Sequence, residues 1–269
     1  MMTLGAVGYL NALPLVHGLD RPQNLRVIRK VPSALLEDLE GGRLDAALCP
    51  VIDVQRSRRE LVIVPAGGIG SRARTLTVRV FSRRPLPDVR HIWADGDSHT
   101  SVALAQIVFQ RLYGSSLEVL PLKDPSSLEE NRTVSTALLI GDKVVTAEPS
   151  ESRFPYQLDL GQAWRDITGR PFVFAAWLAP AGLNLGALPT QLEELRLRNM
   201  ADLEDMVPAW AEEHGWPADL ALTYLRDLLD YEINGEHLAA IEFFWHECAE
   251  FGLINDLRPL KLYETRVGY

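Results

Sequence analysis

The sequence has little of the chemistry that marks several large classes of protein. Its 269 residues contain only two cysteines, Cys49 and Cys248, which form no C-x-x-C pair. This spacing gives no sign of a disulfide framework or a zinc knuckle and favours a reducing compartment. The patterns of a P-loop, a zinc protease helix and an esterase nucleophile elbow are absent too. The six histidines show no ligand spacing, so no metal site is expected.

Basic charge is also scarce. The chain has 27 Lys and Arg against 36 Asp and Glu, a net charge of -9, which speaks against nucleic acid or an anionic membrane as a partner. No basic segment precedes the apolar residues at the N-terminus, so we expect no signal peptide. The uncharged stretch 171–189 is interrupted by Pro180 and Gly182, so no membrane span is expected. A cytoplasmic protein is therefore predicted.

What the chain does contain is enough apolar residue for a large core. Hydrophobic residues make up 47% of the sequence and mean hydropathy is -0.02, values typical of a soluble globular protein. Strand-like and helix-like segments alternate, which predicts an α/β fold with mostly parallel sheets. Strands are expected at 3–7, 25–31, 44–49, 61–64, 75–81, 89–94, 117–120, 136–140 and 171–178. Helices are expected at 32–39, 98–112, 160–168, 188–214, 217–233 and 236–251.

The length of the chain suggests two lobes, although no Ser/Gly linker divides it. Two α/β lobes without a linker can be joined by strands that run from one lobe into the other, as in proteins that close by a hinge. The natural crossings are 75–82 outward and 172–179 back. We therefore predict lobe I at residues 1–82 plus 176–269 and an inserted lobe II at residues 83–175. A ligand would lie in the cleft between them.

One dinucleotide-like pattern lacks the structural context that dinucleotide binding needs. Gly68, Gly70 and Ala73 match G-x-G-x-x-A, but a strand follows them where a pyrophosphate needs a helix N-terminus. Ser71, inside this pattern, is kept as a candidate ligand contact because it precedes the crossing strand. The alternative is an ordinary turn serine.

Three polar loops follow strand ends and are candidates for ligand binding: 8–11, 96–101 and 140–142. In the second loop, Ser98, Thr100 and Ser101 open an apolar helix with hydroxyls and free N–H groups, which suits a carboxylate. An ordinary helix cap is the alternative. Asn11, shortly before Pro14, could equally serve turn chemistry. A hydrolase triad at Ser98 lacks an evident base.

Five motifs in order carry a resemblance to a known family: GYLNALPL, GRLDAALCPV, DSHTSVALAQ, ALLIGDKVV and LDLGQAWRDITGRPFVFAAW. The sequence resembles the chorismate dehydratases of the futalosine route to menaquinone over residues 4–180. The resemblance implies an α/β, two-lobed type 2 periplasmic-binding-protein-like fold, with a cleft between the lobes and a helical C-terminal region. It also implies a cytoplasmic enzyme.

A sister family in the same pathway, the dihydroxynaphthoate synthases, shares this fold and uses a catalytic histidine after the strand that ends here at Ile140. This chain has Gly141 and Asp142 there, and its first loop is the asparagine type, YLNALP. The dehydratase assignment is therefore favoured, with the sister activity as an alternative. Two positions depart from the family pattern: His99 stands where arginine is common, and Thr77 where serine is expected.

The resemblance implies a hydro-lyase that acts on chorismate without a cofactor. Asn11 and Thr77 would be catalytic, holding the substrate and the departing oxygen, while the substrate's own enolpyruvyl carboxylate takes the proton. The candidate substrate-binding residues are Ser71, Ser98, His99, Thr100, Ser101, Gly141 and Asp142. A protein that binds a small carboxylate without chemistry is the alternative from another class, because a fold does not confer catalysis. The sequence carries no signature of an oligomeric state.

Overall fold

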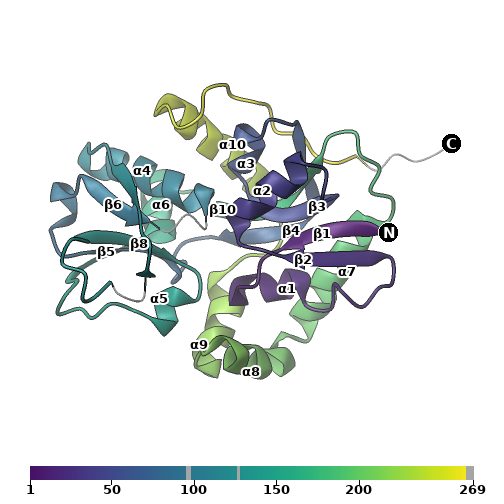
Figure 1. The fold of residues 1–269 in the computed structure, drawn as a ribbon, viewed down its shortest axis with the longest axis horizontal. Coiled ribbons are helices and arrows are strands. Elements are labelled where there is room, and N and C mark those ends of the chain that lie inside the picture. Colours follow the sequence, from purple (N-terminus) through teal and green to yellow (C-terminus); the bar gives the residue numbers. More distant parts are fainter. Residues whose placement is uncertain (95–97, 126–127, 265–269) are drawn as a thin grey trace.

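Two α/β bodies lie side by side in the computed structural model, which describes residues 1–94, 98–125 and 128–264 (Figure 1). Each body is built around one five-stranded sheet. We use lobe I for the body around the sheet that contains the N-terminal strand, and lobe II for the other. The predicted ligand-binding loop 96–101 begins with Gly96 and Asp97, which lie outside the described residues.

The sheet of lobe I has the order β2-β1-β3-β10-β4. Its strands are β1 (Met2–Ala6), β2 (Leu25–Arg29), β3 (Ala46–Pro50), β4 (Leu61–Ser71) and β10 (Phe172–Pro180). Strand β1 is parallel to both β2 and β3, whereas β10 is antiparallel to β3 and β4. Strand β3 is buried along its whole length, as expected for a central strand covered on both faces.

The sheet of lobe II has the order β7-β6-β8-β5-β9. Its strands are β5 (Val78–Ser82), β6 (His91–Ala94), β7 (Glu118–Pro121), β8 (Thr136–Ile140) and β9 (Tyr156–Asp159). Strand β6 is parallel to β7 and β8, and β5 is antiparallel to β8 and β9. Both sheets are therefore mixed. In each sheet four strands run in one direction, as predicted for mostly parallel sheets, and a single strand, β10 or β5, is antiparallel to both of its neighbours.

Ten α-helices accompany the sheets in the described part of the chain. They are α1 (Leu13–Val16), α2 (Pro32–Glu40), α3 (Asp53–Arg56), α4 (His99–Tyr113), α5 (Lys143–Thr146), α6 (Leu160–Thr168), α7 (Leu188–Ala201), α8 (Leu203–His214), α9 (Ala218–Thr223) and α10 (Gly235–Glu250). A π-helical turn, η4 (Tyr224–Leu228), continues α9, and 3₁₀ turns lie at η1 (Leu10–Ala12) and η2 (Leu86–Asp88). Helix α4 ends at Gly114 in the left-handed conformation (φ 64°), the expected stop for a helix.

Two predicted elements have clearly different bounds, and one strand was not predicted. Strand β4 continues past Pro65 to Ser71, because Gly67 adopts φ 96° and the pairing with β10 shifts register there instead of ending. The helix predicted over 188–214 is two helices that meet at Asp202. Strand β9 was not predicted, since it has only four residues, none of them fully buried.

The chain crosses from one sheet to the other at earlier residues than the predicted crossings, 75–82 and 172–179. The chain leaves the first sheet after Ser71 and enters the second at Val78, and it returns between Asp159 and Phe172. Residues 78–82 thus belong to the sheet of lobe II and 172–175 to that of lobe I. Neither β5 nor β10 runs through both sheets.

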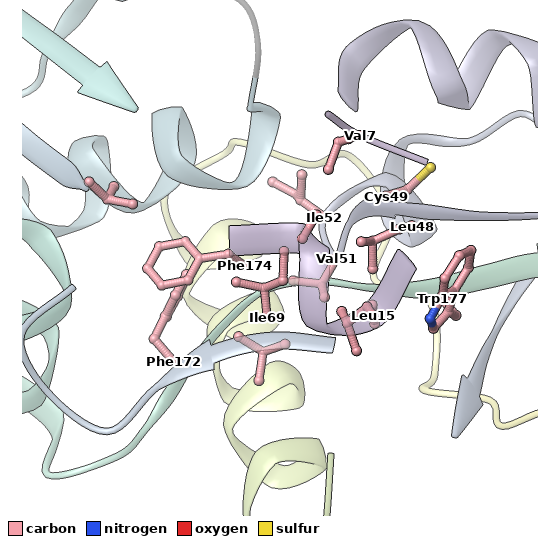
Figure 2. Packing of buried hydrophobic residues seen from close by; sticks show 14 of the residues in the cluster. Val7, Leu15, Leu48, Cys49, Val51, Ile52, Ile69, Phe172, Phe174 and Trp177 are labelled. Atoms are coloured by element: carbon pink, nitrogen blue, oxygen red, sulfur yellow. The ribbon is translucent and has the colours of Figure 1, made fainter. Parts of the chain in front are cut away.

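The larger hydrophobic cluster begins in lobe I and continues along α4 and α6 into lobe II. Figure 2 shows part of it, with Phe172 and Phe174 of β10 next to each other and their ring centroids 4.7 Å apart. A smaller cluster, which includes Phe81 and Phe154, is confined to lobe II. The two lobes therefore share buried contacts beside their connection. Among the described residues, no helix has the length and apolarity that crossing a membrane requires.

Candidate active site

A small cavity of about 50 Å³ lies between the lobes. Lobe I contributes Val7, Tyr9, Asn11, Pro32, Leu48, Pro50, Ile69, Phe174, Ala175, Tyr224 and Leu229. The connecting segment, residues 72–77 between β4 and β5, contributes Thr75 and Thr77. Lobe II contributes Val78, Ser98, Ser101, Ile140 and Gly141. Among these described lining residues there is no Asp, Glu, His, Lys or Arg. Polar groups in this cavity are therefore neutral amides and hydroxyls.

Asn11 lines the cavity from the 3₁₀ turn η1 that follows β1. Its backbone carbonyl accepts a hydrogen bond of 3.0 Å from the Tyr231 hydroxyl, which fixes the turn. Its side-chain Oδ1 is buried and has no hydrogen-bond partner in the protein. Since a buried acceptor without a partner costs free energy, Oδ1 marks a place where a ligand donor fits.

Thr77 lines the cavity from the segment between β4 and β5 and pairs with Tyr224. The Thr77 Oγ1 lies 2.6 Å from the Tyr224 hydroxyl, and both atoms are buried. Gly141 donates its N–H to the Thr77 carbonyl at 2.9 Å. The ring of Tyr224 stacks on Trp216, with centroids 5.0 Å apart. The pair therefore joins the connecting segment to the C-terminal helices of lobe I.

Burial raises the pKa of Tyr224 well above its usual range, although hydrogen bonds with Thr77 and Asn11 partly offset the effect. The phenol is therefore neutral at physiological pH and able to donate a proton to a hydrogen bond. Sequence reasoning missed Tyr224, because a tyrosine inside a helical stretch carries no signal of its own.

The start of α4 presents two hydroxyls to the cavity. Ser98 is the N-cap residue, and its side chain accepts the Ser101 N–H at 3.3 Å. The Ser98 and Ser101 hydroxyls lie 3.1 Å apart and both residues line the cavity. The predicted hydroxyl-bearing helix start thus reaches the cavity through these two residues.

The other two predicted residues of this loop contact lobe I instead of lining the cavity. His99 Nδ1 lies 2.7 Å from Asp53 Oδ1, and Thr100 Oγ1 accepts the Ile52 N–H at 3.3 Å. Asp53 is fully buried, which raises its pKa despite the opposing effect of His99. The structure therefore places His99 and Thr100 in contacts that hold α4 against lobe I.

Gly141 and Asp142 are similarly divided. Gly141 lines the cavity with φ 75°. The Asp142 carboxylate turns to lobe I, where it accepts the Leu10 N–H at 3.2 Å and lies 2.8 Å from His214 Nδ1. Asp142 therefore bridges the lobes next to Asn11.

Ser71 is the predicted contact that the structure places in an ordinary turn. Its hydroxyl donates to the carbonyls of Ala73 and Arg74, accepts the Ala73 N–H, and is not part of the cavity wall. The hydroxyl is used within its own turn, so the alternative of a turn serine describes this position. Arg72, next to Ser71, is ion-paired with Asp230 and Glu236.

No group of three or more His, Cys, Asp or Glu side chains gathers around a possible metal position in the residues that the structure covers. The cysteines Cys49 and Cys248 are free and buried.

Solved structures share this fold at low sequence identity. A protein of Archaeoglobus fulgidus is 11% identical, with a TM-score of 0.72 over 94% of this chain and 98% of its own. The periplasmic aliphatic sulphonate-binding protein of Escherichia coli is 16% identical, with a TM-score of 0.64 over 100% and 95%. A Candida albicans protein described as having the generic periplasmic binding protein fold is 8% identical, with a TM-score of 0.62 over 96% and 92%. The predicted periplasmic-binding-protein-like fold is confirmed.

Sequence similarity points to one metabolic family. A chorismate dehydratase of Thermus thermophilus is 27% identical over 228 residues, which cover 79% of this chain and 82% of the relative. Residues 2–250 match the menaquinone biosynthesis family. That match extends over both lobes and every residue of the cavity wall, and the chain therefore belongs to the menaquinone biosynthesis family.

Proposed function

We propose that this protein is a chorismate dehydratase, a hydro-lyase that converts chorismate to 3-[(1-carboxyvinyl)oxy]benzoate. The observation that carries the proposal is the buried Asn11 Oδ1 without a partner, in one neutral cavity with the Thr77–Tyr224 hydroxyl pair. The similarity to the Thermus thermophilus enzyme supports the choice of substrate. The location in the cytoplasm remains a prediction.

The proposed reaction breaks two bonds of the chorismate ring. The hydrogen on carbon 3 leaves as a proton, the hydroxyl on carbon 4 leaves with its bonding pair, and a carbon 3–carbon 4 double bond completes the aromatic ring. The proton and hydroxide together form one water. The elimination is neither an oxidation nor a reduction. It requires an oriented substrate, a proton acceptor and assistance for a poor leaving group.

Each requirement has a candidate in or near the cavity. One hydroxyl of the Thr77–Tyr224 pair donates to the other, and the one whose proton is not used in the pair would donate a hydrogen bond to the departing hydroxyl. Asn11 would orient the ring through its free acceptor. Ser98 and Ser101 at the start of α4 would receive a substrate carboxylate, since helix N-termini favour anions. The described lining residues include no ionisable base, which fits proton removal by the substrate's own enolpyruvyl carboxylate.

The sister reaction, dihydroxynaphthoate synthesis, has less support. The position after β8 where that family carries its catalytic histidine is occupied here by Gly141 and Asp142. Asp142 is engaged with the Leu10 amide and His214, so it offers no equivalent base to the cavity.

The experiment is turnover of chorismate by the purified protein, with and without EDTA. We expect the ultraviolet spectrum of a benzoate and a product lighter by one water. Asn11→Ala should lower kcat/KM by roughly five- to a hundredfold, since a hydrogen-bonding group left unpaired costs about 1–3 kcal/mol. Asn24→Ala, at an exposed turn, is the matched control and should keep full activity.

Two outcomes would contradict the proposal. Near-normal turnover by a folded Asn11→Ala variant would remove Asn11 from the site. Tight binding of chorismate without any conversion would instead favour the alternative of a small-carboxylate binding protein.

A further inference from the structure

The chain passes from β4 to β5 through a strained turn at Leu76. Leu76 has φ 64° and is the only non-glycine residue with positive φ in the described ranges. The Thr77 N–H donates to the Thr75 carbonyl at 2.7 Å, so the hydrogen bond spans only three residues. A γ-turn with positive φ at its centre is rare and strained. Something else in the fold must hold Leu76 in this conformation.

The side chain that does so is Asp159, at the end of β9. Its carboxylate accepts the Leu76 N–H at 2.8 Å, the Thr75 N–H at 3.0 Å and the Thr75 hydroxyl at 3.1 Å. The donors belong to Leu76 itself and to the residue before it. Asp159 therefore fixes the turn through three hydrogen-bond donors.

The same carboxylate caps α6. Its Oδ1 accepts the N–H groups of Gly161 and Gln162 at 3.0 and 3.1 Å. Helix α6 leads back to β10, so Asp159 binds the outgoing and returning connections between the sheets at one point. It ties together the two segments that carry lobe II.

Gly161 gives an independent sign that this junction is built closely. A Cβ atom at Gly161 would lie 2.3 Å from the Thr75 Cγ2 and 2.5 Å from the Ala73 carbonyl oxygen. Only glycine permits this approach of α6 to the connecting segment. The turn is thus held by a carboxylate on one side and close backbone packing on the other.

We propose that Asp159 is a positioning residue that sets the Thr77 hydroxyl in the cavity through the strained turn at Leu76. Thr77 is the next residue after Leu76, and its hydroxyl must lie within reach of Tyr224 and the substrate. Relaxation of Leu76 to negative φ would turn the following residue away from this position. The inference rests on the proposed dehydratase function for its catalytic readout.

Asp159→Asn tests the role, because asparagine caps a helix as well as aspartate does. If the amide oxygen remains on α6, the amide nitrogen faces the Leu76 N–H, a donor against a donor. We expect kcat to fall about tenfold or more, since small displacements of a reacting group are costly. Product affinity should change by less than about threefold, because the α4 carboxylate site is untouched.

A rescue separates positioning from general damage. Glycine adopts positive φ without strain, so Leu76→Gly should restore kcat about fivefold or more in the Asp159→Asn background. Leu76→Ala is the matched control: it removes the same buried side chain but keeps the Cβ penalty, and it should not restore kcat. Equal effects of glycine and alanine would overturn the proposal, as would a folded Asp159→Asn variant with full kcat.

A second measurement keeps this test separate from the proposed function. Hydrogen exchange of the Thr77 amide reports the turn directly, and it should accelerate about tenfold or more in Asp159→Asn, because the turn opens locally. An unchanged rate would overturn the proposal even if the wild-type protein does not dehydrate chorismate, a result that would refute only the proposed function. If Asp159→Asn fails to fold by circular dichroism, Asp159→Ser, which also caps helices, takes its place with the same expectations.

Discussion

At the residue scale, the cavity pairs two hydroxyls that are 147 positions apart in the chain. Thr77 and Tyr224 meet at 2.6 Å in a buried setting, where a hydrogen bond is stronger than in water and an unpaired hydroxyl is costly. Trp216 holds the phenol ring in place by stacking. A neutral donor fixed in this way can assist a leaving hydroxide without the charge that a lysine would bring.

Tyr224→Phe removes the hydroxyl and keeps the ring. We expect kcat to fall about tenfold or more, as when one preorganised donor is lost. The free energy of unfolding should fall by about 1–3 kcal/mol, because the buried Thr77 hydroxyl loses its partner. Steady-state kinetics and urea unfolding measure the two effects.

Tyr156→Phe is the control for this substitution, since Tyr156 is 40% exposed on β9. Because burial raises the pKa of Tyr224, ionisation of this phenol should cause no loss of wild-type activity between about pH 8 and 10, the upper limit being the pKa of an ordinary tyrosine. Tyr224→Phe with wild-type kcat would show that Thr77 acts alone.

Residue type and loop position were enough to predict part of the cavity wall. Five predicted residues line it: Asn11, Thr77, Ser98, Ser101 and Gly141. Ser71 and Asp142 satisfy their polar atoms elsewhere. A sequence shows which polar residues follow a strand, but not which way each side chain turns, and it gave no sign of Tyr224 because its role depends on contact with a distant segment.

At the element scale, the geometry of a helix explains how α4 divides its first residues. Residues three apart lie on the same face of a helix, so Ser98 and Ser101 both line the cavity. His99 and Thr100 point to other sides and meet Asp53 and the Ile52 amide. One helix start thus serves both the ligand site and the contact between lobes.

This division predicts different effects for two neighbouring substitutions. Ser101→Ala should weaken binding of the benzoate product by about 1.5–3 kcal/mol, the range for a hydrogen bond to a charged group. Thr100→Val should have the smaller effect on binding. It should cost more stability, about 1–3 kcal/mol, because the Ile52 N–H is left unpaired.

Calorimetric titration and urea unfolding of the two variants give this comparison, and each variant is the control for the other. A larger binding loss in Thr100→Val, with unchanged stability, would place the carboxylate at Thr100 instead of Ser101.

Local sequence signals predicted the presence of helices and strands better than the residues at which they end. Pro32 and Gly41 bracket α2 as predicted, because these residues act within one helical turn. Strand β4 passes its predicted stop at Pro65 since long-range pairing with β10 compensates for the irregular residues. Neighbouring strands decide such cases, and they are not visible in a local window.

At the scale of the whole molecule, several contacts hold the lobes together around a neutral cavity. Arg111 of α4, in lobe II, pairs with Glu247 and Glu250 of α10, in lobe I, at 2.7 and 2.9 Å. Asp142–His214 and Asp53–His99 add two more such contacts. With a net charge of -9, attraction of a dianion must come from local N–H and hydroxyl donors rather than the overall field.

The buried thiols and phenols make the fold sensitive to alkali. Burial raises the pKa values of Cys49, Tyr224 and Tyr231, and raises that of Cys248 to about 12. In the unfolded chain a thiol ionises near pH 8.5 and a phenol near pH 10. Above pH 8.5 the unfolded state therefore loses protons that the folded state keeps, and the free energy of unfolding falls as pH rises.

Cys248 allows this prediction to be measured for one group. At pH 10 its thiol should cost the fold about 2 kcal/mol relative to pH 8.5, at about 1.4 kcal/mol per pH unit. Cys248→Ala loses packing at every pH, but its stability should decline less steeply between pH 8.5 and 10 than that of the wild-type protein. Urea unfolding of both proteins in reducing buffer compares the slopes, and other groups that titrate in this range cancel in the difference. Equal slopes would mean that the buried thiol is not the group that weakens the fold in alkali.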